Sequence, residues 1–78
     1  MLDDETKIYT VGPRLGLFPR QLEVLALCAA GLSYRDIGAI LHVKPETVRR
    51  HLYVINRRLG VKSRVQAALC YYRALVGP

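Results

Sequence analysis

Apolar residues recur every three or four positions along most of this 78-residue chain. This spacing is that of amphipathic helices, and glycine and proline divide it into four runs. We therefore predict helices over residues 19–30, 34–41, 45–59 and 64–76. The predicted inward residues are Leu22, Leu25, Ala26 and Ala29 in the first helix, Ile37, Ile40 and Leu41 in the second, and Val48, Leu52, Ile55 and Leu59 in the third. The pattern predicts an all-α domain.

Residues 1–16 have a different pattern. They open with an acidic run, alternate weakly like a short strand over 7–11, and contain Gly12-Pro13 and Gly16, which break helices. We interpret 1–16 as a flexible arm or linker, or as the remainder of a connection to another domain, and we assign the folded domain to 17–78.

The second and third predicted helices are joined by only three residues, 42–44, which makes a helix-turn-helix. An ordinary helical hairpin is the alternative. Two features favour the helix-turn-helix. Gly38 lies mid-helix, where glycine costs about 1 kcal/mol relative to alanine, a cost that makes sense if the next helix crosses at close range. The third helix is also the longer one and carries the positive charge.

Positive charge is concentrated in the second half of the chain. Residues 1–43 have a net charge of −1, from four basic and five acidic side chains, whereas 44–78 have a net charge of +7, from eight basic side chains and Glu46. A one-sided basic field attracts a polyanion such as nucleic acid. The alternative is a solvated basic face that only keeps the protein soluble.

The side of the third helix opposite its apolar stripe is polar and rich in arginine. It carries Glu46, Arg49, Arg50, Tyr53 and Arg57. A helix fits the major groove of DNA, where arginine can bond guanine O6 and N7 together. We predict that Arg49, Arg50 and Tyr53 face bases, because they lie in the half of the helix that enters the groove most deeply. For each, the alternative is a solvated surface residue.

Further side chains flank this face and would contact the DNA backbone, which supplies affinity without sequence information. These predicted backbone contacts are Ser33, Tyr34, Arg35, Lys44, Thr47, Arg57, Arg58, Lys62 and Arg64. The first three open the second helix, whose N–H groups can meet a phosphate. Arg64 has an alternative structural role, which is to tie the last loop to the third helix.

The fourth helix has more apolar surface than one core contact needs. Within its body only Gln66 and Arg73 are polar, although a surface helix usually buries about a third of its circumference. We predict a homodimer contact that involves Leu69, Tyr72, Arg73 and Val76. The alternative is that the aromatic rings only cover gaps in a small core.

No pattern of catalytic, cofactor-binding or metal-binding residues is found. The two cysteines and two histidines lack zinc-ligand spacing, and phosphate-loop and nucleophile-elbow motifs are absent. No apolar run is long enough to cross a membrane, and no signal peptide is seen. We predict no enzyme activity, no cofactor and no membrane partner. Cys28 and Cys70 are expected to be buried, reduced thiols of a cytoplasmic protein.

Four segments together resemble the LuxR-type (GerE-type) helix-turn-helix domain. They are Leu17-Phe18-Pro19-Arg20-Gln21-Leu22-Glu23-Val24-Leu25, Gly31-Leu32-Ser33 with Asp36-Ile37-Gly38, Thr47-Val48-Arg49-Arg50-His51, and Ile55-Asn56-Arg57-Arg58-Leu59-Gly60-Val61-Lys62-Ser63-Arg64. The resemblance implies a four-helix domain of a bacterial transcription regulator, often preceded by a sensing domain. The third helix would read the major groove, the fourth would dimerise, and the position of Thr47 would meet phosphate.

The sequence departs from the usual family pattern at several positions. Phe18 replaces a serine or threonine cap, Lys44-Pro45 replaces Ser-Glu, Tyr34 and Val54 replace asparagines, and Tyr71 replaces a small residue. Lys44 puts a cation at the positive end of the third helix, which a phosphate would offset.

The leading hypothesis is a sequence-specific regulator that binds double-stranded DNA as a dimer, with RNA polymerase as a further candidate partner. The alternatives are a protein-interaction module that uses the apolar fourth helix, and a non-specific nucleic-acid binder.

Overall fold

The structure, a computed structural model, describes residues 11–77. Four helices follow one another over Pro19–Ala29 (α2), Tyr34–Leu41 (α3), Pro45–Leu59 (α4) and Arg64–Val76 (α5). Residues 11–15 are also helical, and residues 11–77 contain no strand. The predicted all-α fold is confirmed, and the predicted helix ends differ from these bounds by one residue, at the end of α2.

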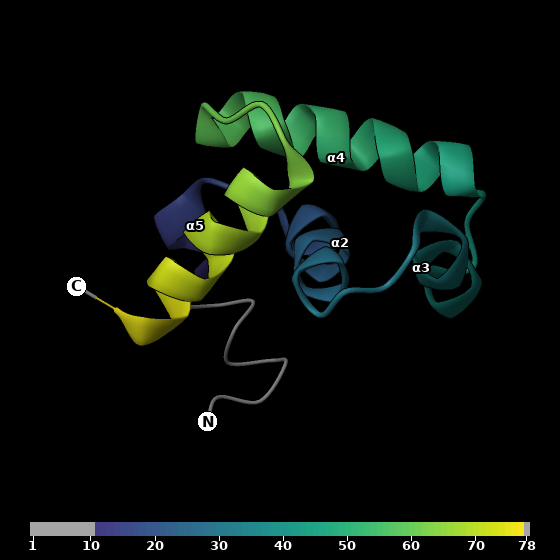
Figure 1. The fold of residues 1–78 in the computed structure, drawn as a ribbon, viewed down its shortest axis with the longest axis horizontal. Coiled ribbons are helices and arrows are strands. Elements are labelled where there is room, and N and C mark those ends of the chain that lie inside the picture. The colour runs from purple at the N-terminus through teal and green to yellow at the C-terminus, as the bar shows by residue number, and fades with distance from the viewer. Residues whose placement is uncertain (1–10, 78) are drawn as a thin grey trace.

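The central helix of the bundle is α2, which contacts α3, α4 and α5. α4 lies along one side of the molecule and contacts the other three helices (Figure 1). Since α2 has neighbours on several sides, it buries Val24 completely as well as the predicted Leu22 and Leu25. Ile37 of α3 and Ile55 of α4 are fully buried against it. The outer side of α4 is thereby left without a neighbour in the bundle.

One predicted core residue of α3 is exposed. Ile40 is 52% exposed, whereas Ile37 is fully buried and Leu41 packs against the core. The prediction that Ile40 faces inward is wrong. In a helix, residue i+4 is rotated by about 40° from residue i, and residue i+3 is rotated by about 60° in the other direction. Gly38 is also buried. The inward face of α3 therefore extends from Ile37 toward Leu41 and Gly38, and Ile40 lies on the opposite flank of Ile37.

Local capping explains where most of the helices begin. The hydroxyls of Ser33 and Ser63 accept hydrogen bonds of 3.1 Å from the backbone N–H groups of Asp36 and Gln66. Phe18 has no hydroxyl, but its own N–H donates to Gln21 Oε1 at 3.0 Å. At the start of α4, Lys44 makes no side-chain cap, and its carbonyl accepts the first turn's N–H groups. Pro45 contributes no N–H there, so fewer groups need a cap.

The prediction that Gly12-Pro13 breaks any helix is wrong. Residues 11–15 are helical and end at Gly16, whose φ is 70°. Val11 is 1% exposed and belongs to the core, and Arg14 Nη1 donates to the carbonyl of Ala74 in α5 at 3.1 Å. These tertiary contacts outweigh the weak helix propensity of glycine and proline. The rest of the predicted arm, residues 1–10, lies outside the described residues, and the boundary at 17 stays a prediction.

The close approach expected at Gly38 is present, and it involves the turn that leads into α4. A Cβ at this position would lie 2.5 Å from the carbonyl oxygen of Val43, whose own N–H donates to the Gly38 carbonyl at 2.9 Å. The turn passes next to α3 because His42 adopts a left-handed conformation, with φ at 60°. Because Gly38 has no side chain, the turn that leads into α4 can pack directly against α3.

We expect Gly38→Ala to destabilise the domain, although alanine normally favours a helix interior by about 0.5–1 kcal/mol over glycine. The added methyl would force the turn away from α3, at a cost of about 1–3 kcal/mol, measurable by urea denaturation. Ala39→Gly is the matched control, since Ala39 is exposed one position along α3 and should lose only the propensity difference. A Gly38→Ala variant at least as stable as the parent would contradict the close approach.

Candidate nucleic-acid interface

The outward face of α4 is open to solvent along its length. Arg49, Arg50, Tyr53 and Arg57 are all exposed, and Tyr53 is 61% exposed. The opposite face buries the apolar stripe of α4 in the core. The bundle thus presents as a free surface the side chains that the sequence predicts to face bases.

Two of these arginines lie against aromatic rings. Arg57 Nη1 donates to the Tyr53 hydroxyl at 3.3 Å, and its Cζ lies 5.9 Å from the centre of the Tyr53 ring. Arg49 Cζ lies 5.7 Å from the ring centre of Tyr34, at the start of α3. Within residues 11–77, the arginines of α4 form no ion pair. Their positive charge is therefore available to an anion from outside.

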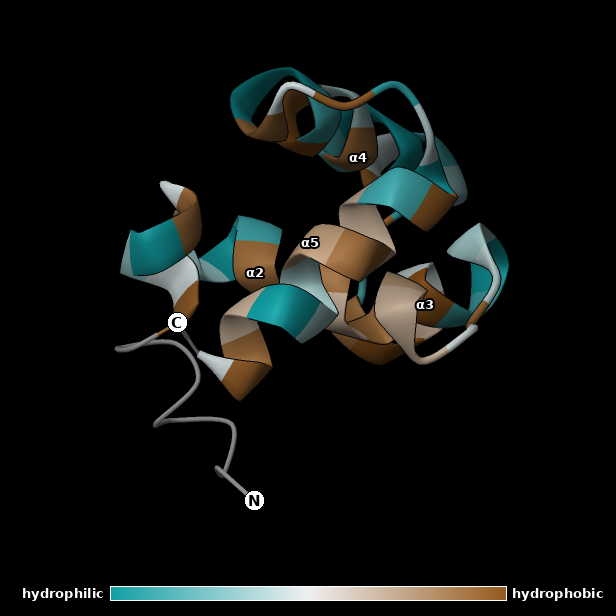
Figure 2. Ribbon diagram, turned by 60° about the vertical axis from the view of Figure 1, so that its left-hand side comes forward, coloured by the Kyte–Doolittle hydropathy of each residue, from teal (hydrophilic) through white to brown (hydrophobic). Residues whose placement is uncertain are grey.

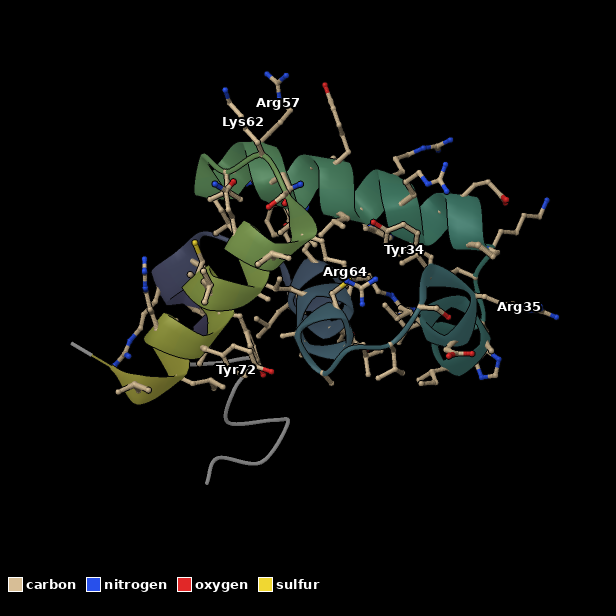
Figure 3. All side chains as sticks on the ribbon, in the orientation of Figure 1. Tyr34, Arg35, Arg57, Lys62, Arg64 and Tyr72 are labelled. Carbon is tan, nitrogen blue, oxygen red and sulfur yellow. The ribbon has the colours of Figure 1, made fainter. Side chains whose placement is uncertain are left out.

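Further exposed cations border this face. Lys44 precedes α4, Lys62 lies in the loop after it, and Arg35 lies in the first turn of α3. In Figure 3, Arg57 and Lys62 extend from the same side of the molecule, away from the bundle. Arg35 points outward at the α3 end. Thr47 is half-buried and Ser33 uses its hydroxyl as a cap.

Two of the arginines predicted to contact the DNA backbone also bind groups within the domain. Arg58 Nη1 lies 3.4 Å from the carbonyl oxygen of Gly16, and its guanidinium lies over the Phe18 ring, 4.9 Å from the ring centre. Arg64 is half-buried and donates to the carbonyls of Cys28 and Leu32. Arg64 thus has the structural role left open above, although it ties α5 to the end of α2 rather than to α4.

The outer side of α5 carries an apolar stripe. Four residues spaced by four, three and four positions are exposed on it: Val65 (70%), Leu69 (49%), Tyr72 (47%) and Val76 (86%). In Figure 2, α5 crosses the front of the view, and most of its ribbon has hydrophobic colours, interrupted by hydrophilic segments. Tyr72 is also held by its hydroxyl, which donates to the carbonyl of Ala29 at 2.5 Å. Tyr71, by contrast, is buried in the core.

Other chemistry has little support in the described part of the chain. Cys28 is buried and Cys70 half-buried, and both are free thiols. Burial raises the pKa of the Cys28 thiol, and the nearby Arg64 charge lowers it in part, so this thiol is a poor nucleophile. Residues 11–77 contain no cluster of three metal-ligating side chains. None of the helices described is both long and apolar enough to span a membrane.

Sequence reasoning missed two features of this surface. Val65 extends the α5 stripe, and its spacing to Leu69 was a usable signal because residues four apart share a helix face. The meeting of Arg49 and Arg64 at the Tyr34 ring had no such signal, because the three residues come from three different helices.

Comparison with known proteins gives a consistent result. Residues 16–71 match the family model described as bacterial regulatory proteins, luxR family. The chain is 47% identical over 53 residues to the protein YhjB of Escherichia coli (strain K12), which covers 68% of this chain and 26% of that protein. It is 38% identical over 55 residues to the nitrate/nitrite response regulator protein NarP of the same organism. This match covers 70% of this chain and 26% of NarP.

A third relative is the transcriptional activator protein BjaR1 of Bradyrhizobium diazoefficiens, which is 36% identical over 67 residues, covering 85% of this chain and 28% of that protein. The chain thus spans about a quarter of the length of these relatives. No solved structure matches. The family match includes α2 to α4 and most of α5, so this chain belongs to the LuxR family of bacterial regulatory proteins.

Proposed function

We propose that this chain is the sequence-specific DNA-binding domain of a bacterial transcription regulator acting in the cytoplasm. α4 enters the major groove, with Arg49, Arg50 and Tyr53 toward base edges. Thr47, Arg57 and the three exposed cations that border the face contact phosphates; these three cations are Arg35, Lys44 and Lys62. RNA polymerase is the further partner expected of such a regulator.

One observation carries this proposal, the open arginine face of α4 on a helix-turn-helix. The arginines of this face have no acidic partner within residues 11–77, so their charge is not neutralised inside the domain. Guanidinium groups match guanine O6 and N7 geometrically, and the flanking cations supply the non-specific attraction that precedes base reading.

The apolar stripe on α5 supports binding as a dimer. Its four exposed residues form a narrow seam over three helical turns, and two copies of such a seam can pack against each other around a two-fold axis. Arg73, which is exposed beside the seam, completes the proposed contact with Leu69, Tyr72 and Val76. A two-fold dimer would read two half-sites about one helical turn of DNA apart.

Selection of bound duplexes from a random pool tests these points together. We expect a two-fold symmetric consensus, in which symmetry reports the dimer and conserved bases report the reading by α4. A consensus without two-fold symmetry would contradict the proposed dimer. A pool of bound duplexes that stays random in sequence would contradict base reading and leave only non-specific binding.

The selected duplex should then show steep salt dependence. Each neutralised phosphate contributes a slope of about −0.9 to log K against log salt. Arg57 and the three bordering cations, engaged in both protomers, give a slope of about −7. A flat dependence would exclude both DNA-binding hypotheses and favour the protein-interaction module.

A further inference from the structure

We infer that Tyr34 positions Arg49 for base reading, through a chain of contacts that ends on Arg64. This inference rests on the proposed function, because it concerns how one of the reading side chains of α4 is held. It assigns Tyr34 a role through its ring, whereas the sequence predicts a backbone contact for this residue.

The chain of contacts begins at Arg64, which is anchored firmly. Its Nη2 lies 3.1 Å from the carbonyl oxygen of Cys28 and also donates to the carbonyl of Leu32. The first of these carbonyls lies in the last turn of α2, where the helix dipole is negative and favours a cation. Arg64 is half-buried there. Its guanidinium is therefore held in place by the carbonyls at the end of α2, on the inner side of α4.

Tyr34 connects the Arg64 guanidinium to Arg49 on the outward face of α4. The centre of its ring lies 5.3 Å from Arg64 Cζ and 5.7 Å from Arg49 Cζ. Both distances are within the range of cation–π contacts. Tyr34 is the first residue of α3, directly after the Ser33 cap, and is half-buried. Figure 3 shows Tyr34 and Arg64 side by side beneath α4.

The contact distinguishes Arg49 from its neighbour. Arg50 is exposed, and within residues 11–77 no aromatic ring lies against it. A long side chain that is already held in place loses less rotamer freedom when it binds. Tyr34 therefore raises the contribution of Arg49 to base discrimination, and it leaves that of Arg50 unchanged.

The first test uses the free protein and the ring-current shift of the Arg49 side-chain protons in NMR spectra. We expect shifted Arg49 Hδ resonances that return to random-coil values in Tyr34→Leu and stay shifted in Tyr34→Phe. Random-coil values in the parent protein would overturn the inference, and this result would not depend on whether the domain binds DNA.

The second test measures affinity for the selected duplex and for each of its single-base-pair variants. Tyr34→Leu should lower discrimination about two- to five-fold, the effect of one exposed cation–π contact. The loss should occur only at base pairs where Arg49→Ala also loses discrimination. Base pairs sensitive to Arg50→Ala are the internal control, and Tyr34→Leu should have no added effect on discrimination in an Arg49→Ala background.

Two further variants separate the ring from the hydroxyl and from folding. Tyr34→Phe keeps the ring and should keep discrimination, and Tyr34→Asn places the usual family residue on the same scaffold and should behave like leucine. If Tyr34→Phe and Tyr34→Leu lower the affinity for every duplex by the same factor, the Tyr34 hydroxyl contacts a phosphate. That result would overturn the inference. Unchanged discrimination in the Leu and Asn variants would also overturn it. If the parent binds no duplex, the proposed function fails and the base-reading role with it, while the NMR test still reports on the contact.

Discussion

Leu69→Glu is expected to abolish self-association and operator binding together. Leu69 lies within the apolar stripe of α5 and is half-exposed in the single chain. A carboxylate there would lose its water within the apolar seam of the dimer, which is unfavourable even with Arg73 one turn away. Since linked half-sites gain about 10²- to 10⁴-fold in affinity, loss of the dimer should reduce binding to a symmetric site by about that factor. Sedimentation velocity and fluorescence anisotropy measure the two effects.

Gln66→Glu is the matched control for this experiment. Gln66 is exposed on α5 but lies off the stripe, and its Oε1 accepts the Lys62 N–H at 2.8 Å. Glutamate keeps that acceptor and adds the same charge, so both association and DNA binding should persist. A Leu69→Glu variant that still dimerises would exclude the α5 contact. One that is monomeric yet binds DNA as the parent does would assign the stripe to another protein partner.

Arg50→Ala is expected to remove base preference at one position of each half-site. Arg50 is exposed at the centre of the outward face of α4. A bidentate contact with guanine discriminates by about 1–3 kcal/mol, which corresponds to a factor of about 5 to 150 in relative affinity. Competition binding with single-base-pair variants of the selected duplex measures this loss. Arg49→Ala should have a comparable effect at a neighbouring base pair.

Lys62→Ala separates base reading from charge. Lys62 is exposed in the loop between α4 and α5, and we assign it to a phosphate. Its replacement should weaken binding to every duplex by a similar factor and reduce the salt slope by about 1. If Arg49→Ala, Arg50→Ala and Lys62→Ala all weaken binding equally on every sequence, the domain is a non-specific nucleic-acid binder.

The helices and the outward face of α4 could be predicted because their determinants are local. Ser33, Pro45, Gly60 and Ser63 mark helix ends through their own backbone and side-chain chemistry. The helical period alone places Arg50 opposite Leu52 and Ile55. Such signals lie within a few residues of the structure they determine, so a single sequence contains them.

The features that could not be predicted depend on contacts between distant parts of the chain. Arg64 binds a carbonyl 36 positions earlier, and Arg14 binds one 60 positions later. The sequence leaves a structural role for Arg64 as one alternative and indicates no partner for Arg14, and only the packed bundle brings their partners close. Ile40 was misplaced for the same reason, because which flank of a short helix is covered depends on where its neighbours lie.

The stretch over residues 11–16, ahead of α2, is attached to two other helices. Arg14 bonds to Ala74 in α5, and the Gly16 carbonyl accepts from Arg58 in α4. Val11, which precedes both attachments in the chain, is buried in the core. A displacement of residues 11–16 would therefore disturb contacts with α4 and with α5 together, the two helices that carry the proposed contact surfaces.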